Sequence, residues 1–139
     1  MDKITSSKKV LFTGDRNWSN IKLVEDVIDK LPKETLIIVG DCPTGLDFIV
    51  EYICIKRGLT YNKYEAYWLS QGNAAGPIRN KRMIDEGKPD LIIAFHDNID
   101  GNNSNKGTKK SKGTKNTLIL GKQAHIPCYL ITTSGFIEY

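Results

Sequence analysis

Cysteine and histidine are scarce in this sequence of 139 residues, which contains three cysteines and two histidines. Cys42, Cys54 and Cys128 lie far apart, with no CxxC pair and no histidine at the spacing of zinc ligands. An odd, scattered set of this kind argues against a disulfide framework and against a zinc site. We therefore expect reduced thiols, no bound metal and a location in the cytoplasm.

Targeting segments and standard nucleotide motifs are missing as well. The N-terminus has no apolar stretch of the kind found in signal peptides, and no run approaches transmembrane length, so we expect no membrane association. The chain contains no GxxxxGK[ST] loop, no GxGxxG after its first apolar run and no GxSxG elbow. The sequence therefore points to no cofactor and to none of the common phosphate-binding or hydrolase motifs.

What is present is the composition of an ordinary globular protein, with 40% hydrophobic and 26% charged residues and a net charge of +4. This length predicts a single domain over residues 1–139. Residues 97–112 form a Lys/Asn/Gly-rich stretch that cannot bury apolar surface, so we expect a flexible loop there. Its lysines either are solvated or act as a lid over an anion.

Apolar runs and helical periodicities alternate along the chain. Continuous runs predict buried strands at residues 10–12, 36–39, 61–66, 91–95 and 126–131, and residues 1–7 are expected to be frayed. Apolar residues at helical spacing predict helices near 19–31, 46–57, 76–87 and 114–124, the first with Ser19 as its N-cap. Strands without polar alternation are typical of a parallel sheet covered on both faces, so we predict a five-stranded, doubly wound α/β fold.

The loops of this predicted fold are of two kinds. Those from helix to strand are short, whereas those from strand to helix, at residues 13–18, 40–47, 67–79 and 96–114, are long and contain glycines. In an open parallel sheet the second kind gathers at the carboxyl edge, where ligands bind at the point at which strand order reverses. We therefore expect a binding cleft at that edge.

The side chains in these loops favour an anionic ligand. Glycines such as Gly40 and Gly45 allow close approach of the backbone, and Arg79 and Arg82 lie three residues apart in a helix entered through Gly76 and Pro77. Arginine grips phosphate bidentately, and helix starts attract anions. Arg16 belongs to the same group of cations.

Other residues of these loops suit the rest of a nucleotide. Asp41 or Asp47 could hold a ribose hydroxyl, although Asp47 could equally only cap its helix. Trp18 and Trp68 offer flat faces for a base, but each could instead pack in the core. His96 directly follows the fourth predicted strand and is better placed for a site than His125.

Several segments, in order, resemble the SLOG superfamily and more narrowly its YspA/YpsA-related group. They are TGDRNW at 13–18, GDCPTGLD at 40–47, Trp68 with GNAAGPIRNKRM at 72–83, DLIIAF at 90–95 and SKGT at 111–114. The resemblance implies a Rossmann-like fold and a site for a nucleotide or an ADP-ribose-like signal. With the loop residues above, it gives the candidate ligand-binding set: Gly14, Asp15, Arg16, Trp18, Gly40, Asp41, Thr44, Gly45, Asp47, Trp68, Gly76, Arg79, Asn80, Arg82, Gly113 and Thr114.

The same superfamily holds the LOG phosphoribohydrolases, which cleave an N-glycosidic bond. Their PGGxGTxxE motif corresponds to the region ending at residues 113–117, and their glutamates fall on Asn116 and Thr117. Cleavage needs an acid or base beside the developing charge, which Asn and Thr cannot supply. Hydrolysis would need a carboxylate from another loop, namely Asp15, Asp41, Asp47 or Glu65. The candidate catalytic residues are Asp47 and Arg82.

Three functions therefore stay open at this point. The first is a binding protein that senses or sequesters the ligand, and the second is a LOG-like hydrolase. The third is nucleic-acid binding through the lysine-rich loop, as in the related DprA proteins, although that loop lacks the stacking aromatics of single-strand binders. The resemblance also suggests a homodimer.

Overall fold

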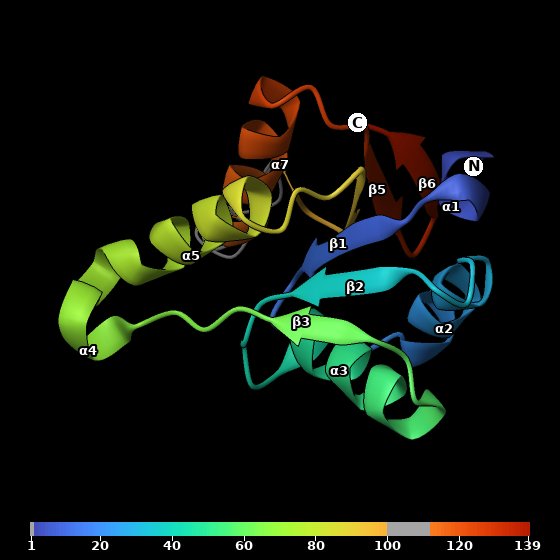
Figure 1. Cartoon of the computed structure of the whole chain (residues 1–139), viewed down its shortest axis with the longest axis horizontal. Helices are drawn as coiled ribbons and strands as arrows, with labels where there is room; N and C mark the ends of the chain where they lie inside the picture. The colour runs from blue at the N-terminus through green and yellow to red at the C-terminus, as the bar shows by residue number, and fades with distance from the viewer. Residues whose placement is uncertain (1, 100–111) are drawn as a thin grey trace.

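The computed structural model describes residues 2–99 and 112–139 and contains one six-stranded sheet in the order β3-β2-β1-β4-β5-β6 (Figure 1). The parallel strands are β1 (Lys9–Gly14), β2 (Leu36–Val39), β3 (Tyr61–Lys63), β4 (Leu91–Phe95) and β5 (Cys128–Thr132). β6 (Gly135–Glu138) runs antiparallel to β5. Strand order reverses between β1 and β4, which pair with Gly14 opposite Phe95.

The prediction of five strands is wrong in number, because β6 was not anticipated. It returns along β5 after a two-residue turn, in which the Ser134 N–H donates to Thr132 Oγ1 at 3.1 Å. All four residues of β6 are exposed, including Phe136 and Ile137. A short strand at the edge of a sheet needs no continuous buried run, so it lacks the signal that identified the other strands.

Helices cover both faces of the sheet. They are α1 (Asp2–Ser6), α2 (Ile21–Asp29), α3 (Gly45–Arg57), α4 (Trp68–Gln71), α5 (Ala75–Asp85) and α7 (Lys112–Gln123), with a 3-10 turn η1 at Gly72–Ala74. α2 and α3 lie on one face, and α5 and α7 lie on the other (Figure 1). The predicted α/β, Rossmann-like architecture is confirmed in this respect.

The core is divided by the sheet into two apolar clusters. Phe12 of β1 packs with Val24 of α2 and Leu46 of α3, whereas its neighbour Leu11 packs with Met83 of α5 on the opposite face. Successive side chains of a strand point to opposite faces, so a strand buried on both sides reads as an uninterrupted apolar run. This is why the central strands were located well from sequence.

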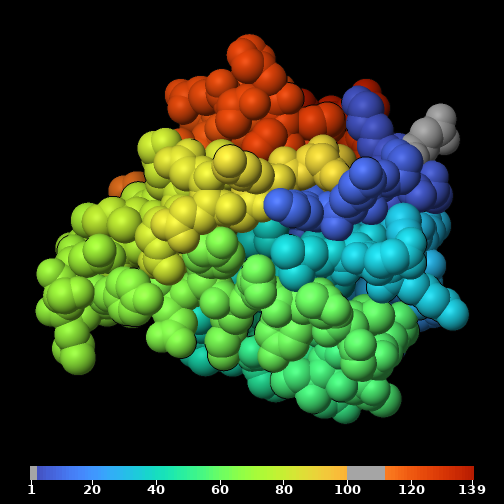
Figure 2. Space-filling view, in the orientation of Figure 1, coloured from blue at the N-terminus to red at the C-terminus, as the bar shows by residue number. Residues whose placement is uncertain are grey.

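Three local predictions need correction. Residues 2–6 form a helix and Ile4 is fully buried, so the chain start is not frayed. The N-cap of α2 is Asn20, whose side chain accepts the Leu23 N–H at 3.1 Å, one residue after Ser19. The predicted loop 67–79 contains α4 and η1, and this segment projects from one side of the molecule (Figure 2).

Most of the lysine-rich loop lies outside the described residues. Its first part is tied down, since Asp97 Oδ1 accepts the Thr133 N–H at 2.7 Å, and Lys112 already belongs to α7. Residues 100–111 are those not described. Across residues 2–99 and 112–139, no helix combines the length and the apolar character that a membrane crossing requires.

Candidate functional site

A hollow of about 90 Å³, open to solvent, lies at the carboxyl ends of β1 and β2. Its wall combines these two strand ends with the starts of α3 and α7 and the middle of α5, which are far apart in the sequence. The residues that line it are Phe12, Thr13, Gly14, Arg16, Gly40, Cys42, Asp47, Arg79, Asn80, Met83, Gly113 and Thr114. The predicted cleft at the carboxyl edge therefore has a physical counterpart.

Half of the candidate ligand-binding set lines this hollow. These residues are Gly14, Arg16, Gly40, Asp47, Arg79, Asn80, Gly113 and Thr114. The others do not line it, namely Asp15, Trp18, Asp41, Thr44, Gly45, Trp68, Gly76 and Arg82. Arg16, Arg79 and Asp47, the charged members of the set, therefore line the same hollow.

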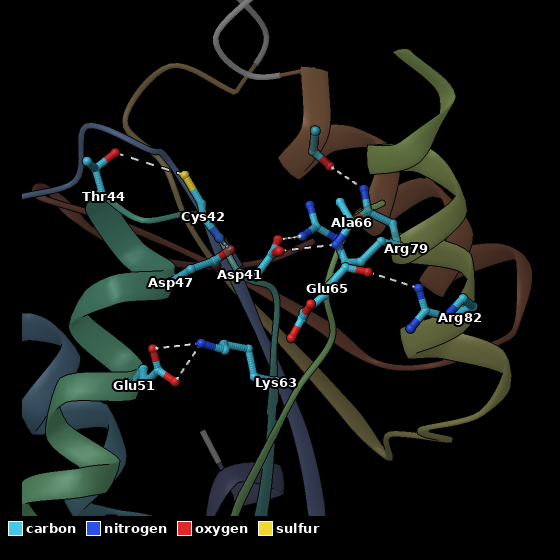
Figure 3. A network of polar contacts seen from close by, with 12 residues as sticks. Asp41, Cys42, Thr44, Asp47, Glu51, Lys63, Glu65, Ala66, Arg79 and Arg82 are labelled. Atoms are coloured by element: carbon cyan, nitrogen blue, oxygen red, sulfur yellow. Dashed lines mark hydrogen bonds and ion pairs between the residues drawn. The ribbon is translucent and has the colours of Figure 1, made fainter. Parts of the chain in front are cut away.

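Arg79 is the most enclosed cation of the hollow. Its side chain is 14% exposed, and its Nη1 donates to Asp41 Oδ1 at 2.7 Å (Figure 3). Its Nε donates to Asn80 Oδ1 at 2.9 Å. Asp41 uses its other oxygen to accept the Ala66 N–H at 3.1 Å, so this ion pair also ties the exit of β2 to the segment that leads into α4.

Asp47 lies in the first turn of α3, and its Oδ2 accepts the Cys42 N–H at 3.2 Å. Burial raises the pKa of Asp47 to about 6. The Cys42 hydrogen bond and the Arg79 charge oppose this rise in pKa, while the Asp41 charge adds to it. Asp47 is thus mostly ionised at neutral pH and takes up a proton within the physiological range.

Two glycines are required by close approach of the chain. A Cβ on Gly40 would lie 2.8 Å from both Arg79 Nη1 and Asp47 Oδ2, so a side chain there would force the ends of these two side chains to move. Gly45 has φ +71, and a Cβ there would lie 2.2 Å from the Arg16 carbonyl carbon. Thr44 Oγ1 donates to Arg16 O at 2.9 Å. Gly45 and Thr44 therefore position the loop that carries Arg16.

Asn80 joins α5 to the start of α7. It is 4% exposed, and its Nδ2 donates to Gly113 O at 3.4 Å and to Asn116 Oδ1 at 3.1 Å. Thr117 Oγ1 also donates to Gly113 O at 3.3 Å. Asn116 and Thr117 thus fix the first turn of α7 beside the hollow.

Arg82 lies away from the hollow. Its Nη1 donates to Glu65 O at 3.0 Å, and its guanidinium carbon lies 5.5 Å and 5.1 Å from the ring centres of Tyr64 and Tyr67 (Figure 3). These contacts stabilise the packing of the segment before α4 on α5. Arg82 as a catalytic residue stays a prediction that these contacts do not favour.

The two tryptophans occupy different environments. Trp18 is 6% exposed, packs edge-on against Phe95 and donates its indole N–H to Asn20 O at 3.0 Å. Trp68 is 55% exposed on α4, and its ring lies 3.3 Å from where a Cβ on Gly76 would stand. Neither lines the hollow, so a base in this hollow would not reach either ring without movement of the chain.

Sequence reasoning missed four lining residues as candidates, namely Phe12, Thr13, Cys42 and Met83. Thr13 and Cys42 fall in the strand-to-helix loops, so their position was a usable signal. Phe12 and Met83 are buried core residues, and sequence alone does not show which core side chain also faces a hollow.

The hollow thus offers cations, backbone N–H groups and one titratable carboxylate. Among residues 2–99 and 112–139, no group of three or more His, Cys, Asp or Glu residues is placed to hold a metal ion. Cys42, Cys54 and Cys128 are free thiols. No protein-family model matches this sequence, and no curated protein matches it. The function of the hollow therefore has to be inferred from the residues that line it.

Proposed function

We propose that this protein binds a nucleotide or a nucleotide-derived, ADP-ribose-like anion at the carboxyl edge of its sheet, as a sensor or a sequestering protein. The observation that carries the proposal is the convergence of Arg16, Arg79 and the start of α7 on one hollow. Two guanidinium groups and a helix N-terminus are a strong combination for phosphate.

The phosphate and the ribose of such a ligand have partners in the hollow. Arg16 is exposed, and its side chain forms no ion pair within the described part of the chain, so it is available to phosphate. Gly113 and Thr114 add N–H groups at the positive end of the α7 dipole. Asp47 is an acceptor for a ribose hydroxyl when it is ionised.

The sequence resemblance supports the same ligand class. We infer membership of the SLOG superfamily from the motif strings, and a cytoplasmic location and a homodimer remain part of this proposal. A LOG-like activity is less well supported, because Asn116 and Thr117 replace the glutamates and form hydrogen bonds of their own.

The experiment that tests this proposal is a ligand panel. The purified protein is heated with ADP-ribose, AMP, cyclic dinucleotides or inorganic phosphate, and its melting temperature is measured. A ligand that binds only the folded state raises the melting temperature in proportion to the logarithm of its concentration. Calorimetry then gives the affinity, and mass spectrometry identifies any small molecule that copurifies. A protein that responds to no member of the panel contradicts the proposal.

One observation favours a second candidate function, cleavage of an N-glycosidic bond. Asp47 has its pKa raised to about 6 by burial, and a group that titrates near neutrality suits general acid or base catalysis. The test is chromatographic detection of free base and ribose phosphate after incubation with nucleoside monophosphates. Release that disappears in Asp47→Asn supports this function, and unchanged substrate after long incubation excludes it.

A further inference from the structure

His96 carries a buried nitrogen that the proposed function does not use. It directly follows β4, is 2% exposed and anchors its backbone by donating its N–H to Ile131 O at 3.1 Å. Its Nδ1 accepts the Asn98 N–H at 2.9 Å. An Nδ1 that accepts is unprotonated, so the neutral imidazole carries its proton on Nε2. Within residues 2–99 and 112–139, this buried Nε2 has no hydrogen-bond partner.

Asp15 faces His96 from the neighbouring strand. Its backbone is fixed on both sides, since its N–H donates to Phe95 O at 2.9 Å and its carbonyl accepts the Leu46 N–H at 3.0 Å. Oδ1 of Asp15 accepts the Asn17 N–H at 2.9 Å. Oδ2 lies 4.0 Å from His96 Nε2, and the Asp15 side chain is 20% exposed.

This separation is too long for a direct hydrogen bond but suits one oxygen atom between the two groups. An oxygen about 2.8 Å from each would close the gap. On one side it would meet a donor, the Nε2–H, and on the other an acceptor, the carboxylate. A hydroxyl group satisfies both, because it accepts one hydrogen bond and donates another.

We propose that Asp15 and His96 form a hydroxyl-binding pair that holds a sugar hydroxyl of the bound ligand. The pair spans the ends of β1 and β4, where strand order reverses and where ligands of open α/β sheets bind. Asp15 stands between Gly14 and Arg16, which both line the hollow. This inference rests on the proposed function and names a second contact for its ligand.

The chemistry of the pair excludes a metal ion and a phosphate group. A metal ion needs a lone pair on Nε2, but the Asn98 contact places the proton there. A phosphate group is repelled by the Asp15 carboxylate and is better served by Arg16. Leaving a buried histidine N–H without a hydrogen-bond partner costs free energy, so a hydroxyl that accepts from this N–H is bound more tightly.

The tautomer of His96 tests the pair before any ligand is added. Long-range proton–nitrogen NMR at alkaline pH distinguishes the two imidazoles, and the exposed His125 serves as the internal control. We expect the Nε2–H tautomer at His96, with a nitrogen resonance that moves in Asp15→Asn while that of His125 does not. An Nδ1–H tautomer at His96, or an unmoved resonance, overturns the pair.

Deoxy analogues test the hydroxyl itself. AMP is compared with its 2′-deoxy and 3′-deoxy forms by calorimetry and by the His96 resonance. Loss of the hydroxyl that the pair holds should weaken binding about 10-fold, the effect of one hydrogen bond to a charged group. In Asp15→Asn the amide oxygen keeps the Asn17 N–H, so a donor NH₂ replaces the acceptor Oδ2 and this preference should disappear. Asp26→Asn, an exposed change on α2, is the matched control and should retain it.

The outcomes separate the two proposals. If AMP binds but both deoxy forms bind equally well, and the wild-type His96 resonance stays unmoved by any of them, the hydroxyl-binding pair is wrong and the proposed function stands. The wild-type spectra give this answer even if Asp15→Asn does not fold. If no probe binds, the proposed function fails and the inference fails with it.

Discussion

The two ends of the sheet each have a hollow, and they differ in polarity as well as in size. The hollow at the amino end measures about 210 Å³ and is lined mainly by apolar residues such as Ile28, Leu31 and Ile37. Its arginine, Arg57, donates to Asp29 and to Glu25, so that charge is already neutralised. The hollow at the carboxyl end measures about 90 Å³ and contains Arg16, which has no such partner among the described residues.

This difference shows that volume alone does not identify a site. The amino-end hollow is the larger of the two, but only the carboxyl one combines an unpaired cation with a helix start and a titratable carboxylate. At the amino end, polar groups form hydrogen bonds that hold the fold together. One example is the Asp90 carboxylate, which accepts the Lys8 N–H at 2.9 Å. The predictions below test this contrast.

Filling the carboxyl hollow should have the largest effect. In Gly40→Val, the added side chain displaces Arg79 and Asp47, since a Cβ would already lie 2.8 Å from each. We expect ligand binding below detection and a loss of about 1–3 kcal/mol in the free energy of unfolding. Calorimetry and urea unfolding measure these effects. Gly113→Ala is the folding control, because a Cβ there meets no atom within 4 Å, and equal stability losses in both variants would contradict the prediction.

Removing the titratable carboxylate should have the next largest effect. Because the pKa of Asp47 is raised to about 6, the folded protein binds a proton more tightly than the unfolded chain. The contribution of Asp47 to stability is therefore fully present below about pH 4 and is lost as the pH rises through 6, by up to about 3 kcal/mol. Asp47→Asn should be more stable than the wild type at pH 7.5 and equal to it near pH 4 in urea unfolding.

The control for this pH dependence is the exposed pair on α5. Asp85 lies 2.8 Å from Lys81, and both side chains are largely exposed. Asp85→Asn should change stability little and leave the difference between pH 4 and pH 7.5 as in the wild type. Unfolding curves of Asp47→Asn that run parallel to those of the wild type across this range would refute the assignment.

Removing one arginine from each hollow should change ligand affinity less, but it compares the two hollows directly. Arg16→Ala should weaken an anionic ligand about 30-fold, the effect of about 2 kcal/mol from a charge-assisted contact. Arg57→Ala should leave the affinity unchanged, since this arginine lies at the amino end. Titration calorimetry at fixed salt measures both. Equal losses in the two variants would show that the effect comes from net charge rather than from the hollow.

Thiol protection should give the smallest effect. Burial raises the pKa of Cys54 and of Cys128 to about 11, whereas Cys42 is half-buried in the carboxyl hollow. Iodoacetamide should therefore modify Cys42 first, and ligand at ten times its Kd should slow this reaction about tenfold by occupancy. Mass spectrometry of peptides follows each cysteine, and an unprotected Cys42 would place the ligand elsewhere.

The sequence predicted the fold well where burial on both faces leaves a continuous apolar run. β4 was located residue for residue at 91–95, and α3 ends before Gly58, which has φ +67, as its C-terminal signal indicates. β6 and α1 were missed because an exposed edge strand and a five-residue helix carry no periodic signal. Their stability comes from pairing and packing that only the folded chain provides.

The candidate site was predicted in part for a similar reason. Residues such as Arg16 and Asp47 were found because strand-to-helix loops must gather at one edge of a parallel sheet. What the loops did not reveal is which side chains are already paired: Arg82 is held by Glu65 O and two tyrosine rings, and Trp18 packs on Phe95. Such pairings depend on distances between segments that are remote in sequence.

In the carboxyl hollow, Asp41 competes with any bound anion for Arg79, because the two side chains already form an ion pair. Any anion that reaches Arg79 must share it with, or take it from, a carboxylate that is fixed by its own backbone contact at Ala66. A chloride or a free phosphate gains little from that exchange. A larger molecule that also engages the other parts of the wall gains more, so the abundant small ions of a cell are discouraged from occupying the hollow.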